Sequence, residues 1–346
     1  MLGPQTRSKW WSASKAPFFP SLAIADRPAA SIAYVAGYGR SGSTLLERML
    51  AERADVVATG ELFQLFTMAA RGRVRCACGE LATNCVFWSA VLAAVGQATP
   101  GSPVEWEQLR LGEEADRRLW WFRRRRRYPA GLSYRRLSQV VLEEIAVCSG
   151  LDGGVIVDSS KTAYHAGERP SALRERAGLD VYVVHLVRDP RAVVWSVVGR
   201  GSNRSLEGAA HRPVLGWLAP IAGWIRANRI AERLQIEFGA SRYLLIRYED
   251  LVANPDAQLS LVEDFLRLPA GRARTTREGH QLGGNRTRFS STIEIRPDME
   301  WRDRLPVLAQ WLIVLVTWLP MRRYGYLGGR GRPQRRSRPF RRATSS

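Results

Sequence analysis

Residues 31–50 read SIAYVAGYGRSGSTLLERML, and this stretch decides the fold class. An apolar run at 31–36 leads into a loop with three glycines, and apolar residues at helical spacing follow from Leu45. This order predicts a strand, a tight loop and a helix. Such a loop aims backbone N–H groups and a helix start at one place, which favours a bound phosphate-like anion.

Four more short apolar runs recur along the chain. They occupy residues 56–58, 154–157, 181–187 and 243–246. Strands that alternate with helices form parallel sheets covered on both faces. We therefore predict an α/β fold, a P-loop-type parallel sheet with helices on both faces. Residues 60–150 follow a looser pattern and are predicted to be an insertion in the sheet order.

Length and composition favour one large ordered region. The chain has 346 residues and enough apolar side chains for a sizeable core. No linker divides it clearly, so one domain is predicted at 31–328, preceded by an N-terminal extension at 1–30. The tail at 329–346 mixes Arg with Gly, Pro and Ser and is predicted to be disordered.

The chain is strongly basic, with 52 Lys and Arg against 32 Asp and Glu and a formal net charge of +20. This charge implies an anionic partner, and nucleic acid, a membrane surface, a nucleotide and an acidic glycan all qualify. Five consecutive arginines stand at 123–127. The basic tail is interpreted as a solvated segment, with peripheral membrane contact or polyanion binding as the alternative.

Neither end of the chain predicts secretion or a membrane span. The N-terminal stretch lacks a basic start followed by an apolar run, so a cytoplasmic location is expected. Residues 305–319 are strongly apolar but shorter than the roughly 20 residues that cross a bilayer. They are predicted to form a buried amphipathic helix, with membrane-surface contact as the alternative.

Three of the four cysteines, Cys76, Cys78 and Cys85, stand in one short stretch. No histidine or fourth cysteine is near them in sequence to complete a tetrahedral metal site, so no metal is predicted. A local disulfide or a reduced structural loop is expected instead. Cys148 is interpreted as a core residue near a helix end.

The loop itself has the frame Gly37-x-x-x-x-Gly42-Ser43-Thr44. A nucleotide triphosphatase places lysine where this chain has Ser43, and here Arg40 supplies the cation from inside the loop. The departure argues against ordinary ATP or GTP hydrolysis. A purely structural turn is the alternative interpretation of the glycines.

A second anion-binding pattern follows the predicted strand at 181–187. It begins with Arg188-Asp189-Pro190-Arg191 and continues with Ser196 and Arg200. Pro190 suits a first helical turn, and the spacing of four puts Ser196 and Arg200 on one helical face. Together with Arg188 they predict a second phosphate site. The alternative is a surface ion pair between Arg188 and Asp189.

The two patterns together resemble the 5′-phosphosulfate and 3′-phosphate motifs of sulfotransferases that use 3′-phosphoadenosine-5′-phosphosulfate (PAPS). The motifs are Gly39-Arg40-Ser41-Gly42-Ser43-Thr44-Leu45-Leu46 and Leu186-Val187-Arg188-Asp189-Pro190-Arg191 through Ser196. The chain is most similar to the bacterial branch, which is related to tyrosylprotein and carbohydrate sulfotransferases. The resemblance runs from about Ile32 to Leu327 and includes the Cys76 and Cys78 loop, Asp158-Ser159-Ser160-Lys161, Arg247-Tyr248-Glu249-Asp250, and Gly283-Gly284-Asn285 ahead of Arg288.

The resemblance implies roles for individual residues. It implies that the 5′-phosphosulfate is held by Arg40, Ser41, Gly42, Ser43 and Thr44. It implies that Arg188, Ser196 and Arg200 hold the 3′-phosphate, and that Tyr248 lies against the nucleotide. The loop from Gly284 to Arg288, with Asn285 and Arg288 as binding residues, is expected to close over it.

Glu61 is implied as the catalytic base, since the tyrosylprotein branch has a glutamate at this spacing from the first motif. It also follows the predicted strand at 56–58, at the same sheet edge as the loop. An N-cap charge for a helix at 62–70 is the alternative. Lys161 is predicted to be the catalytic cation beside Arg40, with a simple pair to Asp158 as the alternative.

The four histidines fit the role of catalytic base less well than Glu61 does. His185 falls inside an apolar strand and is interpreted as a satisfied core residue, and His165 is kept as a reserve base. His211 and His280 do not have the sequence position expected of a base either.

The predicted function is metal-independent, in-line transfer of a sulfuryl group from PAPS to a hydroxyl or amine. The acceptor class is open; the insertion is expected to shape its pocket, and the arginine run favours an acidic acceptor. The alternatives are a P-loop kinase-like enzyme, which would bind ATP with Mg²⁺, and a basic nucleic-acid-binding protein. Nucleic acid is the less favoured partner.

Overall fold

The computed structural model describes residues 29–72, 74–114, 128–163, 166–199, 215–270, 279–290, 292 and 295–327. Several predicted features lie outside them: the N-terminal extension up to residue 28, the five arginines at 123–127, His165, Arg200, His211 and the basic tail. The chain forms two compact units. One contains residues 1–188 and 222–297, and the other contains 189–221 and 298–346. The predicted domain limits, 31–328 with flanking segments, stay a prediction.

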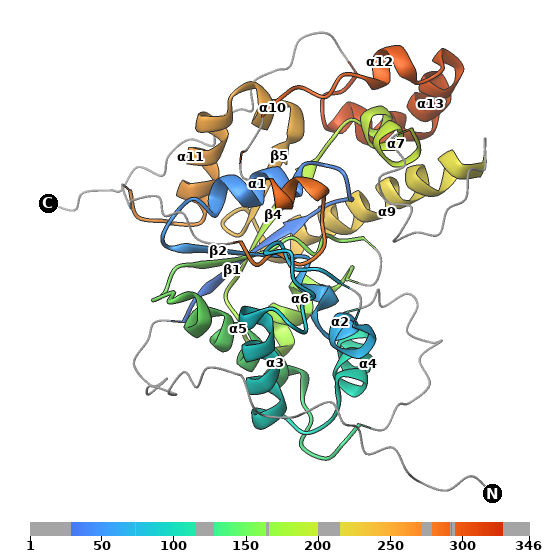
Figure 1. The fold of residues 1–346 in the computed structure, drawn as a ribbon. Helices are drawn as coiled ribbons and strands as arrows, with labels where there is room; N and C mark the ends of the chain where they lie inside the picture. The colour runs from blue at the N-terminus through green and yellow to red at the C-terminus, as the bar shows by residue number, and fades with distance from the viewer. Residues whose placement is uncertain are drawn as a thin grey trace, which may run out of the picture. The chain divides into compact units, whose positions relative to one another are not determined.

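The first unit is built on a sheet of five parallel strands in the order β2-β3-β1-β4-β5 (Figure 1). The strands are β1 (Ser31–Ala36), β2 (Val56–Gly60), β3 (Val155–Asp158), β4 (Val181–Val187) and β5 (Tyr243–Arg247). β1 is central, and its Tyr34 is in register with Asp158 of β3 and Val183 of β4. The predicted parallel α/β sheet is confirmed, and each predicted strand matches an observed one within two residues.

Side chains alternate between the two faces of the sheet, and helices cover both. Ile32 and Tyr34 of β1 join one buried cluster, whereas Ala33 and Val35 join the other. The first cluster includes side chains of α2 (Leu65–Arg71), α3 (Val86–Ala98), α4 (Pro103–Glu114), α5 (Tyr134–Ser149), η4 (Ala172–Arg176) and the second half of α9 (Leu215–Phe238). The second includes side chains of α1 (Ser43–Leu50), α10 (Tyr248–Ala253) and α11 (Pro255–Phe265). Figure 1 shows α1, α10 and α11 on one side of the strands and α2 to α5 on the other.

The predicted insertion is the connection between two neighbouring strands. β2 and β3 pair directly, so the chain between Gly60 and Val155 leaves the sheet and returns beside the strand it left. On the way it forms η2 (Leu62–Gln64) and helices α2 to α5. Its role in shaping an acceptor pocket stays a prediction.

The second unit contains α7 (Pro190–Val198), α12 (Trp301–Arg304) and α13 (Val307–Arg323). Pro190 opens α7 as predicted, and the Asp189 carboxylate caps the helix by accepting from the Arg191 N–H at 2.9 Å. The Asp189 carboxylate also pairs with the Arg191 guanidinium. α7 ends at Val198, before Arg200.

Helix α13 corrects the prediction of a buried helix at 305–319. Only Ala309, Ile313, Thr317 and Met321, one stripe at a spacing of four, are buried. Eight large apolar side chains are exposed: Val307, Leu308, Trp311, Leu312, Leu315, Val316, Trp318 and Leu319. The apolar run winds around the whole helix, so a single packed stripe leaves most of it uncovered. Among the described helices, none has both the length and the hydropathy to cross a bilayer.

Candidate functional site

The loop between β1 and α1 contains three residues in the left-handed region. They are Gly37 (φ 115°), Arg40 (φ 69°) and Gly42 (φ 96°). A Cβ on Gly37 would collide with the Leu186 carbonyl, and one on Gly42 would lie 2.5 Å from Cδ2 of Tyr248, so both positions need glycine. Arg40 holds a conformation that costs a side-chain-bearing residue on the order of 1 kcal/mol. Left-handed residues before a helix are one way in which proteins build anion-binding concavities.

Ser41 lies in this loop with an unsatisfied hydroxyl. Its side chain is 2% exposed, and Oγ has no hydrogen-bond partner among the described residues. A buried hydroxyl without a partner costs on the order of 1–3 kcal/mol. An anionic oxygen in the loop would accept this bond, so the loop fits a phosphate or sulfate group.

Arg188 at the end of β4 reaches the same loop. Its Nη1 donates to the Arg40 carbonyl at 3.0 Å, and its guanidinium lies 4.3 Å from the centre of the Tyr248 ring. The Trp224 indole donates to the Arg188 carbonyl at 3.0 Å. Three predicted site residues, Arg40, Arg188 and Tyr248, therefore meet beside Gly42.

Ser196, the partner predicted for Arg188, is on α7 in the second unit, where it is buried. Arg200 lies outside the described residues. The sharing of one phosphate by Arg188, Ser196 and Arg200 stays a prediction.

Glu61 and Lys161 follow neighbouring strands, β2 and β3, and form an ion pair. Lys161 Nζ donates to Glu61 Oε1, and Gln64 Nε2 donates to Glu61 Oε2. Glu61 is the N-cap residue of η2, but its side chain makes no capping bond. Lys161 also donates to the Ser159 carbonyl at 3.2 Å. The carboxylate is thus held by side chains, and the lysine pairs with it rather than with Asp158.

Glu47 of α1 is part of this region and was not predicted. Its Oε1 accepts from the Gly60 N–H at 2.5 Å, and its Oε2 accepts from the Ser159 hydroxyl at 3.0 Å. Burial raises the pKa of Glu47 to about 8. The sequence contains a signal for its burial, because the helical period places Glu47 on the buried face with Ser43, Leu46 and Leu50.

Residues 279–285 run alongside Glu61 at one end and alongside Thr44, at the start of α1, at the other. Leu282 N–H donates to the Thr59 carbonyl at 2.8 Å, and the Leu282 carbonyl accepts from the Glu61 N–H at 2.6 Å. The Asn285 N–H donates to Thr44 Oγ1 at 3.2 Å. This segment connects the side of Glu61 with the start of α1.

Arg288 follows in the same segment. Its Nη1 donates to the Gly284 carbonyl at 2.9 Å, and its Nε is buried without a hydrogen-bond partner among the described residues. Burial lowers the pKa of Arg288, and the charge of Glu61 acts in the opposite direction. The structure therefore places Arg288 within electrostatic reach of Glu61.

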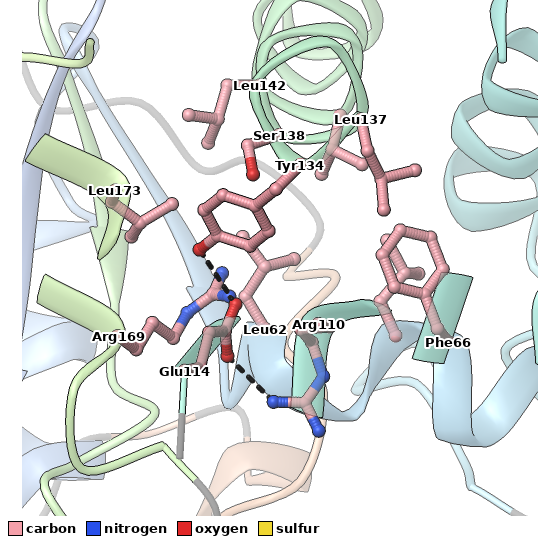
Figure 2. A pocket seen from close by; sticks show the side chains of 12 residues that line it. Leu62, Phe66, Arg110, Glu114, Tyr134, Leu137, Ser138, Leu142, Arg169 and Leu173 are labelled. Atoms are coloured by element: carbon pink, nitrogen blue, oxygen red, sulfur yellow. Dashed lines mark hydrogen bonds and ion pairs between the residues drawn. The ribbon is translucent and has the colours of Figure 1, made fainter. Parts of the chain in front are cut away.

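A buried ionic network lies behind the β3 end of the site. Arg169 pairs with Asp158 at 2.8 Å and also with Glu114, which in turn accepts from Arg110 at 2.7 Å. Figure 2 shows Glu114 between the two arginines, with the Tyr134 hydroxyl bonded to it at 3.0 Å. The cavity there, of about 20 Å³ and lined by apolar side chains together with this network, is large enough for about one water. It is too small for an acceptor substrate.

His185 is a core residue, as predicted. Nδ1 hydrogen-bonds the Tyr243 hydroxyl at 2.6 Å and Nε2 hydrogen-bonds Asn228 Oδ1 at 2.8 Å. Burial lowers the pKa of His185 to about 4. The ring is therefore neutral and fully engaged, and it has no role as a base.

His280 has an unexpected placement. The structure brings it to Cys76, Cys78 and Cys85, the three cysteines that lacked a fourth partner in the sequence. All four cysteines are free thiols, and Cys148 is partly buried against the core near the end of α5. Of the two expectations for this stretch, a local disulfide and a reduced loop, the structure shows the reduced loop.

Comparisons with known proteins find similarity in sequence for part of the chain and in fold for most of it. Residues 176–271 match the model of the "Sulfotransferase family". A sulfotransferase domain from the curacin biosynthetic pathway is 21% identical, with 85% of this chain and 98% of that chain covered and a TM-score of 0.52. No curated protein sequence matches with significance.

Two further solved structures are similar at lower scores. The sulfotransferase domain of the Synechococcus PCC 7002 olefin synthase is 21% identical, with 85% and 96% coverage and a TM-score of 0.46. Mouse sulfotransferase SULT7A1 complexed with PAP is 12% identical, with 86% and 85% coverage and a TM-score of 0.42. Residues 176–271 are thus similar to the sulfotransferase family, and the chain shares its fold with the curacin-pathway sulfotransferase domain.

Proposed function

We propose that this enzyme transfers a sulfuryl group from PAPS to a hydroxyl or amine of its acceptor, with Glu61 as the base. The buried, unpartnered hydroxyl of Ser41 carries the proposal, because it needs an acceptor that an anion in the loop would supply. The neighbouring Arg40 and Arg188 supply positive charge, and the Tyr248 ring supplies a flat surface for a nucleotide.

In the proposed reaction a bond forms between the acceptor atom and sulfur while the bond from sulfur to the bridging phosphate oxygen breaks. The acceptor proton passes to a Glu61 oxygen, and adenosine 3′,5′-bisphosphate leaves. Lys161 and Arg40 would balance the charge that develops on the bridging oxygen. Positioning, a base and these cations suffice for such an in-line displacement, so the proposed chemistry uses no metal.

The proposal predicts which nucleotide binds. Adenosine 3′,5′-bisphosphate should bind tightly in calorimetry and ATP with Mg²⁺ weakly, because Arg188 is proposed to bind a 3′-phosphate. Ser41→Ala should weaken the bisphosphate and PAPS by roughly 10- to 100-fold, the effect of losing a hydrogen bond to a charged group.

Ser171→Ala is the matched control. Ser171 Oγ is also buried without a hydrogen-bond partner among the described residues, but Ser171 belongs to α6 (Arg169–Ser171) rather than to the loop. This variant should bind the bisphosphate like wild type. Equal effects of the two variants would contradict the loop assignment, and preference for ATP with Mg²⁺ would favour a kinase-like enzyme. Transfer from labelled PAPS, screened by mass spectrometry over glycan, peptide, lipid and metabolite acceptors, then identifies the substrate.

A further inference from the structure

Four side chains with metal-binding atoms converge away from the phosphate-type loop. The three Sγ atoms of Cys76, Cys78 and Cys85 and a ring nitrogen of His280 all lie within 4.8 Å of one another. Cys76 and Cys78 belong to one tight turn, in which the Gly79 N–H donates to the Cys76 carbonyl at 3.0 Å. Cys85 is the N-cap residue of α3, and His280 comes from the segment beside Glu61.

The distances between these atoms suit a shared tetrahedral ion. Cys76 Sγ and Cys85 Sγ are 3.6 Å apart, and His280 Nδ1 lies 3.5 Å from the first and 3.4 Å from the second. Tetrahedral bonds of about 2.3 Å to sulfur and about 2.0 Å to nitrogen place neighbouring ligand atoms roughly 3.5–3.8 Å apart. A disulfide would need the two sulfurs at about 2.05 Å. We propose that Cys76, Cys78, Cys85 and His280 bind one structural Zn²⁺ ion.

The histidine is held in an orientation that fits this role. Its ring stacks on Phe87 with 4.8 Å between centres and 5° between planes, and its carbonyl accepts from the Trp88 indole at 2.7 Å. Nδ1 faces the sulfurs, so Nε2 carries the proton in the neutral ring that binds metal. Phe87 and Trp88 are the second and third residues of the helix that Cys85 caps, so one element fixes two ligands.

The donor set favours zinc. Three thiolates and one imidazole are ligands typical of closed, four-coordinate structural zinc sites, which leave no position for a substrate. Cys76 and Cys85 are buried, whereas Cys78 is exposed and gives the ion a route into the site.

The position of the cluster indicates what the ion would stabilise. The Ala77 N–H donates to the Gln281 carbonyl at 3.0 Å, and Cys76 forms a β-bridge with Leu282. Leu282 is hydrogen-bonded on its other side to Thr59 and Glu61. The ion would therefore fasten residues 76–85 to the segment that runs between Glu61 and Thr44, and its loss would loosen that segment.

Metal analysis of the full-length chain tests the proposal. Protein expressed with zinc and passed through gel filtration should contain about one zinc per chain by plasma mass spectrometry. Cys78→Ser and His280→Ala should each lose most of it, whereas Cys148→Ser, which changes the one cysteine outside the cluster, should keep it. Exchange for Co²⁺ should give thiolate-to-cobalt charge-transfer bands and the strong visible bands of a tetrahedral site.

A thiol count separates the competing states. With zinc bound, denaturation in chelator without reductant should release four reactive thiols; a Cys76–Cys85 disulfide would leave two and would overturn the proposal. Four thiols with neither zinc nor cobalt uptake would overturn it as well. These measurements on the wild-type chain do not depend on the folding of a variant or on sulfuryl transfer, so failure of the proposed reaction would leave them valid.

Discussion

Glu47 accepts a 2.5 Å hydrogen bond from the backbone N–H of Gly60, the residue that precedes Glu61. The same carboxyl group accepts from Ser159, two residues before Lys161. One buried side chain of α1 thus fixes the ends of β2 and β3, from which the Glu61–Lys161 pair extends. The phosphate-type loop and the ion pair are joined through this helix.

We predict that Glu47 makes folding stability depend on pH. Burial raises its pKa from 4.5 to about 8 in the folded chain, so the folded state binds the proton more tightly than the unfolded state. Its contribution is fully present below about pH 4.5 and is lost as the pH rises through about 8.

Urea unfolding of wild type and Glu47→Gln at several pH values between 5 and 8 measures this contribution. The amide keeps the size of the side chain but does not titrate. The stability of wild type relative to the variant should fall across this window by an amount on the order of a few kcal/mol. Parallel pH profiles would show that Glu47 is ionised in the folded chain.

Arg169→Met should destabilise the fold strongly. The guanidinium pairs with both Asp158 and Glu114 in the interior, and removing it leaves two buried carboxylates without that cation. Breaking a buried pair in this way typically costs about 3–5 kcal/mol. Chemical denaturation measures the loss of unfolding free energy.

Arg176→Met is the matched control. Arg176 pairs with Glu113, but the two side chains are 32% and 33% exposed, and pairs near the surface contribute about 0–1 kcal/mol. Similar costs for the two variants would contradict a structural role for the buried network.

The sheet was predictable because its strands are short apolar runs. β4 is buried along its whole length, and residues 181–187 show the apolar pattern, interrupted by His185, of a parallel strand that is covered on both faces. The meeting of Glu61 with Lys161 also followed from general rules, since both come after parallel strands whose carboxyl ends share an edge. To predict their ion pair, one further fact was needed: that β2 and β3 are neighbours in the sheet.

The parts that were missed depend on contacts that no local pattern encodes. His280 reaches Cys85 across 195 positions, through a segment with little regular secondary structure. The exposure of α13 was missed because composition shows that a helix is apolar but not which sides another element covers. The ionic network of Arg169 likewise joins elements from three parts of the chain.

Arg188→Ala should weaken binding of adenosine 3′,5′-bisphosphate about tenfold or more, because it removes a charge-assisted contact worth roughly 1.5–3 kcal/mol. The variant also loses the contact of the guanidinium with the Tyr248 ring. Calorimetry gives the affinity, and a thermal scan shows that the chain remains folded.

Arg242→Ala is the control for lost charge. Arg242 pairs with Asp180, just before β4 begins, so it lies at the opposite ends of the strands from Arg188. Its removal should leave the affinity within about twofold, as expected for a distant charge screened by salt. Equal losses in both variants would mean that the bisphosphate responds only to net charge.

Glu61→Gln should keep PAPS binding and lose turnover. The amide retains the size of the side chain and an oxygen that can accept from Lys161, but it cannot take a proton from the acceptor hydroxyl. Loss of a general base typically lowers the rate by about 10² to 10⁴. Because the pair with Lys161 is largely buried, the amide should also lower stability by an amount on the order of 3 kcal/mol; a purely structural role would show this loss of stability with a near-normal transfer rate.

Single-turnover transfer at saturating PAPS, with one identified acceptor, measures the rate, and calorimetry measures the affinity. Glu263→Gln, the same chemical change on α11, controls for the lost charge: Glu263 pairs with Arg53, and this variant should transfer at the wild-type rate. A slow Glu61→Gln enzyme with normal PAPS affinity would support the base role, because binding and folding would both be intact. A near-normal transfer rate would contradict that role. The next residue to test would then be His165, four positions after Lys161, since a histidine so close in sequence to the paired lysine could reach the same acceptor proton.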